Sequence, residues 1–68
     1  MVDTKKLKGI ISERDMSQRK IAKQLGMTEK TFYSKMKRGV FDSDEIFTMI
    51  SILDIDDPAA IFFAQSVT

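Results

Sequence analysis

The chain has 68 residues with no cysteine and no histidine, 43% hydrophobic residues, and a formal net charge of +1. Its length suits a single domain over residues 1–68, and its composition excludes disulfides, thiolate metal sites and the usual general base of enzymes. No apolar run reaches the roughly 18 residues of a membrane span and no secretory signal is recognisable, so we expect a cytoplasmic protein without membrane, metal or cofactor partners.

Two helices are predicted in the first third of the chain. The first covers about residues 4–14 and begins after Asp3, whose carboxylate can accept a hydrogen bond from an unpaired backbone N–H. The second covers about residues 18–25 after Ser17, and Gly26 ends it because glycine adopts positive φ without strain. The apolar residues that recur with helical spacing, and that we expect in the core, are Leu7, Ile10, Ile11, Ile21, Ala22 and Leu25.

The third and fourth predicted helices carry the same kind of signals. The third covers about residues 29–37 and is capped by Thr28. The fourth covers about residues 43–53 and follows Asp42, which is spaced to form a capping box with Glu45. The residues expected to face the core are Phe32 and Met36 from the third helix, and Ile46, Phe47, Ile50 and Leu53 from the fourth.

A fifth helix is predicted over about residues 58–65. Pro58 suits its first position, where the missing N–H would have no partner, and Asp57 is the expected cap. Phe62 and Phe63 are adjacent, so only one of them can face the core, and we expect the other to be partly exposed. We predict that the exposed side belongs to a two-fold dimer interface. The predicted dimer contacts are Ile61, Phe62, Phe63 and Val67.

The charges are strongly segregated along the chain. Residues 1–38 contain all 11 Lys and Arg and only four acids, a net charge of +7, whereas residues 39–68 contain six acids and no base, a net charge of −6. This polarity predicts a positive face turned toward a polyanion and an acidic side turned away from it. The basic residues that we interpret instead as solubilising surface are Lys5, Lys6 and Lys8.

The segment 18–32 carries the most informative pattern. Two short helices are joined by a turn of about three residues around Gly26, and the small residue Ala22 faces the incoming helix. Two helices that cross at a steep angle need a small contact residue and such a turn. The second helix can then protrude, with its outer face free to enter a DNA major groove about 12 Å wide.

This segment resembles the Cro/CI family of helix-turn-helix regulators, which are abundant in temperate phages and prophages. The matching residues are Gln18, Ile21, Ala22, Leu25, Gly26, Met27, Thr28 and Phe32. The resemblance extends to the five-helix frame and to the sequence IDDPAAIFFA, which is similar to the end of small Cro-like proteins. It implies an all-α, lambda-repressor-like DNA-binding domain with the helix-turn-helix at about 18–37.

One position departs from the family pattern. The family usually has an apolar residue three positions after the residue matched by Phe32, but Lys35 stands there and the apolar residue is Met36. We therefore expect the third helix to be rotated or slightly extended, which shifts the set of outward residues by about one position.

The predicted DNA contacts follow from helical geometry and from the resemblance. If Phe32 and Met36 face inward, the residues on the outer face, and the predicted base readers, are Glu29, Lys30, Tyr33, Ser34 and Lys37. The resemblance implies a phosphate contact at Gln18. The full set of predicted phosphate contacts is Gln18, Arg19, Thr28, Lys35 and Arg38.

The leading hypothesis is a sequence-specific transcriptional regulator, a Cro-like phage or prophage repressor that binds a double-stranded operator as a homodimer and acts by occupancy. The alternative is a helix-turn-helix protein that acts through another phage regulator, as co-repressor, anti-repressor or antitoxin. An enzyme is the weakest hypothesis. A Mg²⁺ site from Asp54, Asp56 and Asp57 is conceivable, but a loop and a helix cap explain these residues more simply.

Overall fold

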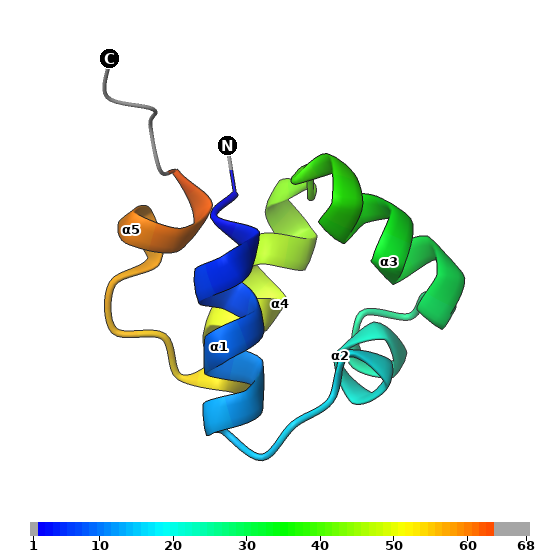
Figure 1. Ribbon diagram of the computed structural model, residues 1–68, viewed down its shortest axis with the longest axis horizontal. Helices are drawn as coiled ribbons and strands as arrows, with labels where there is room; N and C mark the ends of the chain where they lie inside the picture. The colour runs from blue at the N-terminus through cyan, green and yellow to red at the C-terminus, as the bar shows by residue number, and fades with distance from the viewer. Residues whose placement is uncertain (1, 64–68) are drawn as a thin grey trace.

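The computed structural model describes residues 2–63, which fold into five helices without a strand (Figure 1). The helices are α1 (Thr4–Glu13), α2 (Gln18–Gln24), α3 (Glu29–Arg38), α4 (Ser43–Leu53) and α5 (Pro58–Phe62). The predicted all-α class is confirmed. None of these helices is long and apolar enough to cross a membrane.

Local sequence signals account for most of the helix starts. Four predicted N-cap side chains each accept a backbone N–H three residues later: Asp3 from Lys6, Ser17 from Lys20, Thr28 from Thr31 and Asp42 from Glu45. Glu45 also accepts the backbone N–H of Asp42, which completes the predicted capping box. Asp57 occupies the predicted cap position of α5, but its side chain makes no hydrogen bond to the helix. Pro58 at the first position leaves one fewer N–H to satisfy there.

The helix ends differ from the predictions by about one residue. Gly26 and Gly39 follow α2 and α3 with φ of 73° and 68°, a conformation that glycine adopts without strain. The third helix runs through Arg38, one residue beyond its predicted end. The fifth helix ends at Phe62, and residues 64–65 of its predicted range lie outside the described residues.

One core is shared by all five helices. Its fully buried side chains are Phe32, Leu7, Ile21, Met49 and Leu53. The ring of Phe32 packs against that of Phe41, with centroids 5.6 Å apart, and this contact joins α3 to the loop before α4. Edge-to-face and tilted ring pairs at this distance add to the stabilisation from burial alone.

The predicted core position of Phe47 is wrong. Its side chain is 74% exposed, and Met49 is fully buried in its place. Successive helical residues are rotated by about 100°, so the core stripe of α4 runs through Met49 and Leu53 and leaves Phe47 on the other side. Apolar residues surround much of α4, and periodicity alone did not distinguish its buried face.

Three long-range hydrogen bonds connect the residues that flank α1 to distant parts of the chain. The backbone N–H of Val2 donates to the carbonyl of Gly39 (3.3 Å), and that of Asp3 donates to the carbonyl of Ile61 (2.6 Å). Arg14 donates through Nε to the carbonyl of Leu53 (2.8 Å), which is otherwise a free carbonyl at the end of α4. The N-terminal residues therefore anchor both the end of α3 and α5 to the rest of the domain.

Candidate nucleic-acid interface

Helices α2 and α3 form a contacting pair joined by residues 25–28. Ala22 is buried, its carbonyl accepts the backbone N–H of Met27 (3.0 Å), and Phe32 is buried beneath the pair. A methyl side chain at position 22 lets the two backbones approach closely. In Figure 1, α3 lies at the edge of the molecule with one long side facing solvent.

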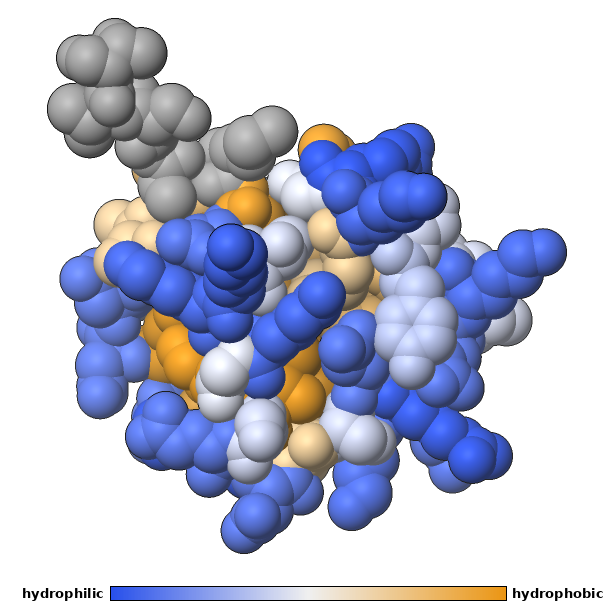
Figure 2. Space-filling model, viewed as in Figure 1, coloured by the Kyte–Doolittle hydropathy of each residue, from blue (hydrophilic) through white to orange (hydrophobic). Residues whose placement is uncertain are grey.

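The outer side of α3 carries five exposed polar side chains. They are the predicted base readers Glu29, Lys30, Tyr33, Ser34 and Lys37. Tyr33 is 48% exposed, so it is a surface residue and not part of the core. Figure 2 shows that hydrophilic side chains cover this side of the molecule, whereas apolar side chains show through between α1 and α5. The structure thus brings all five residues together on one accessible face, which we call the α3 face.

Two residues of the α3 face are joined to each other. The Tyr33 hydroxyl donates a hydrogen bond to Oε2 of Glu29 at 2.8 Å, across one turn of the helix. This bond raises the pKa of Tyr33 above its ordinary value, with further contributions from desolvation and from the Glu29 charge. Their i, i+4 spacing is the sequence signal for such a pair. Glu29 and Tyr33 were each predicted as base readers, and the bond between them was not predicted.

The predicted phosphate contacts occupy different environments. Arg19 and Arg38 are exposed, and Gln18 is half-buried at the first position of α2. The hydroxyl of Thr28 caps α3 and also donates its one proton to the hydroxyl of Thr31 (3.0 Å), so that proton is used within the protein.

Lys35 is a correction, because its ammonium group is not available to a phosphate. It pairs with Glu45 of α4, and the two side chains are only 22% and 12% exposed. The same carboxylate accepts the backbone N–H of Asp42 through its other oxygen, so Glu45 caps α4 and ties it to α3. Position 35 lies between two helices, and the lysine stem can pack there while its charge meets a carboxylate.

The predicted dimer contacts are divided between the core and the surface. Ile61 and Phe62 are 4% and 2% exposed, so we remove them from the candidate dimer contacts. Phe63 is 63% exposed, which agrees with the expectation that one of the adjacent phenylalanines is exposed. Val67 lies outside the described residues. Phe47 and Phe63 line one apolar cavity of about 260 Å³, which we call the α4–α5 groove; its lining residues are Ser43, Ile46, Phe47, Ile50 and Phe63.

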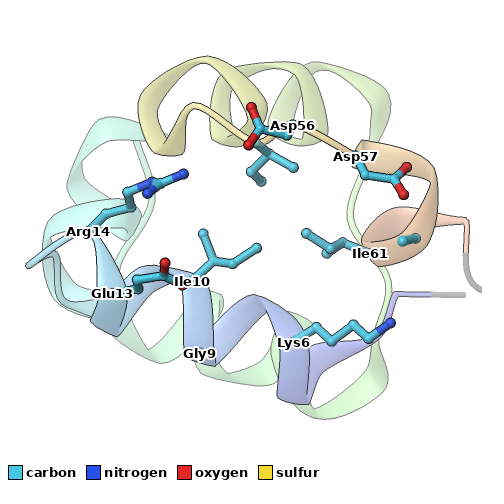
Figure 3. Close-up of a pocket in the computed structure, with 10 residues that line it drawn as sticks. Lys6, Gly9, Ile10, Glu13, Arg14, Asp56, Asp57 and Ile61 are labelled. Carbon is cyan, nitrogen blue, oxygen red and sulfur yellow. The ribbon is translucent and has the colours of Figure 1, made fainter.

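A second cavity of about 440 Å³ lies between α1 and residues 55–61 (Figure 3). Ile10 and Ile61 point into it, while the carboxylates of Asp56 and Asp57 lie at its rim and point away from its centre. Binding pockets have polar groups that converge on a ligand, and these acids do not converge. Within residues 2–63, no group of acidic residues is arranged to hold a metal ion. Asp54, Asp56 and Asp57 therefore do not form the conceivable Mg²⁺ site.

Comparison of the chain with protein-family models, with curated proteins and with solved structures finds no match. The candidate interface therefore rests on the residues and geometry of this chain.

Proposed function

We propose that this domain is a sequence-specific DNA-binding transcriptional regulator of the Cro/CI type, which acts by occupying an operator. The α3 face carries the proposal, because it gathers five exposed polar side chains on a helix at the edge of the domain. An exposed helix of this width fits a major groove, where hydrogen-bond donors and acceptors distinguish the four base pairs.

In this proposal α2 and α3 act as the helix-turn-helix. Lys30 donates to guanine, while Ser34 and Lys37 reach neighbouring bases or phosphates. Arg19 and Arg38 bind phosphates on either side of the groove, and Gln18 contacts a phosphate from the start of α2, where backbone N–H groups favour an anion. The acidic residues from Asp42 to Asp57 then lie in the part of the chain that does not bind DNA.

A single domain of this size contacts few base pairs, so we propose that two copies bind an inverted repeat. Phe47 and Phe63 of the α4–α5 groove are the contacts between copies, since they are the most exposed large apolar side chains of the described residues. Half-sites about 34 Å apart place the two α3 helices in successive major grooves on one side of the duplex.

A second candidate function is contact with another regulator, in which the domain acts as co-repressor, anti-repressor or antitoxin. The exposed aromatic pair Phe47 and Phe63 favours it, because exposed aromatic side chains are enriched at protein interfaces. In that case substitutions on the α3 face would leave function unchanged, while Phe63→Ser would abolish it.

Selection of bound sequences from a random duplex pool, at near-physiological salt, tests the proposal. The wild type is compared with the double variant Lys30→Ala/Ser34→Ala and with the matched control Lys8→Ala/Ser12→Ala, which makes the same changes at the same spacing on exposed positions of α1.

Enrichment of an inverted repeat by the wild type and the control, and its loss in the Lys30/Ser34 variant, is the expected result. A single enriched half-site would keep DNA reading and contradict the dimer. No enrichment, or equal enrichment by all three proteins, would contradict reading by the α3 face and favour the protein-contact function.

A further inference from the structure

We infer that Glu29 and Tyr33 act as one unit that selects cytosine at a single position of the half-site. The inference rests on the proposed DNA-binding function and names the base that this part of the α3 face recognises. It depends on the hydrogen bond between the two side chains, and neither residue type alone leads to it.

The pair has a defined hydrogen-bonding polarity. The phenol has one proton, and that proton is donated to Oε2 of Glu29 at 2.8 Å. Both side chains are exposed on the first turns of α3, so the remaining lone pairs face solvent. The pair therefore presents the carboxylate oxygens as acceptors and has no free donor.

Among the four bases, cytosine best complements such a set of acceptors. Its major-groove edge offers the N4 amino donor without a neighbouring acceptor, whereas adenine places the N7 acceptor beside its N6 amino group. Guanine presents O6 and N7, and thymine presents O4, so both would direct lone pairs at a carboxylate. Cytosine is thus accepted, adenine is tolerated less well, and guanine and thymine are repelled.

Tyr33 is a positioning residue in this unit, because it acts through Glu29. A glutamate on the first turn of a helix has several rotamers, and some of them bend toward the unpaired N–H groups of its own helix end. The hydrogen bond from Tyr33 holds the carboxylate on the α3 face instead. Removal of the hydroxyl should therefore weaken the base preference without changing which base is preferred.

The test is duplex selection with the wild type, Tyr33→Phe and Glu29→Gln, with Glu13→Gln on α1 as the matched control. The wild type and control should enrich cytosine at one position of the half-site. Glutamine pairs with adenine through N6 and N7, so Glu29→Gln should switch that one position to adenine. Tyr33→Phe should lower the preference for cytosine there by about tenfold and leave other positions unchanged.

The outcomes separate this inference from the proposed function. If the wild type enriches a motif and the two variants change no position, or change different positions, the Glu29–Tyr33 unit is wrong and DNA reading stands. If the wild type enriches nothing, the proposed function itself fails. Circular dichroism melting of each variant shows whether it is folded, and Tyr33→Phe keeps the ring that a merely structural role would need.

Discussion

Residues 18–38 and residues 43–63 expose different kinds of side chain. Helices α2 and α3 bury side chains that include Phe32 and Met36, and they expose long charged side chains elsewhere. Helices α4 and α5 also contribute buried side chains, but the aromatic side chains of Phe47 in α4 and of Phe63, just after α5, lie in solvent. The first pair of helices therefore has a polar exposed surface, and the second pair has an exposed surface with aromatic side chains.

This difference shows how a small domain can carry a specific polar surface. A chain of 68 residues has a limited core, so side chains committed to an outer surface must be supported by apolar residues elsewhere. Here α1, α4 and α5 provide that support, which leaves most positions of α3 free to be polar. The two surfaces should consequently respond to different substitutions, unless a substitution removes a contact on which both regions depend.

Phe32 lies in the first region and packs against Phe41, just before the second, so its removal should affect both regions. The ring is fully buried and contacts Phe41, so Phe32→Ala should lower the free energy of unfolding by about 3–5 kcal/mol. For so small a domain that loss abolishes both surfaces together. Thermal melting by circular dichroism measures it, with Tyr33→Ala as the control on the exposed side of the same helix; equal melting of the two variants would contradict the core position of Phe32.

Substitution of both exposed aromatic side chains should affect the contact between copies and leave the stability of the domain nearly unchanged. Phe47→Ser/Phe63→Ser should weaken the binding of a second copy to an inverted repeat at least tenfold, because each apolar side chain contributes roughly 1.5–3 kcal/mol when fully buried. The stability of the isolated domain should change by only about 0.5 kcal/mol. Gel-shift titration on one and two half-sites measures the first effect, and unchanged cooperativity would exclude the α4–α5 groove as the contact.

The ion pair between Lys35 and Glu45 links the two regions directly. Glu45→Gln keeps an acceptor for the Asp42 N–H and removes the charge, so it should destabilise the domain by about 1 kcal/mol. Asp44→Asn, on the same turn, is the matched control. Chemical denaturation compares the two, and the loss at Glu45 should shrink when Lys35→Met is also present. Additive effects of the two substitutions would show that the pair contributes nothing.

Substitution of Arg38 tests the electrostatic contribution of the first region to DNA binding. It is exposed at the end of α3, and Arg38→Ala should weaken binding to all duplex sequences alike. The slope of log affinity against log salt should become shallower by about one, the expectation for a lost phosphate contact. A sequence-dependent loss would instead make Arg38 a base reader.

The smallest expected effect concerns the titration of Tyr33, which is the only tyrosine of the chain. Its pKa is raised by the hydrogen bond to Glu29, so Glu29→Ala should lower that pKa, as followed by phenolate absorbance. Because the folded pKa lies above the unfolded one, the bond stabilises the fold at pH below the ordinary tyrosine pKa. This contribution is lost as the pH rises through the raised pKa. The same pKa in both proteins would show that the pair does not form in solution.

Sequence reasoning succeeded where the determining contacts are local. The caps at Ser17 and Thr28 and the turn at Gly26 depend on neighbours within a few residues, and their positions were predicted correctly. The exposure of the α3 face followed from helical periodicity once Phe32 and Met36 were assigned to the core. The hydrogen bond between Tyr33 and Glu29 depends on the side-chain rotamers, which the sequence pattern does not determine.

The corrections concern contacts between distant segments. Lys35 finds its partner in the next helix, and Arg14 reaches carbonyls 39 and 40 residues away, so no local signal identifies either contact. Phe47 was misplaced because apolar residues occur on several sides of α4. Ile61 was placed at a surface because its burial depends on how α5 packs against α1, which the sequence does not state.

The hydrogen bonds of Val2 to Gly39 and of Asp3 to Ile61 also bear on the order in which the domain forms. The partners of the Val2 and Asp3 N–H groups are Gly39 and Ile61, so the first of these residues to be synthesised must wait for nearly the last. Closing so long a loop carries the largest entropy loss of the contacts described, and such contacts form late in folding. A nascent chain therefore holds the complete sequence of α3 well before it can hold the finished domain, which needs the fifth helix.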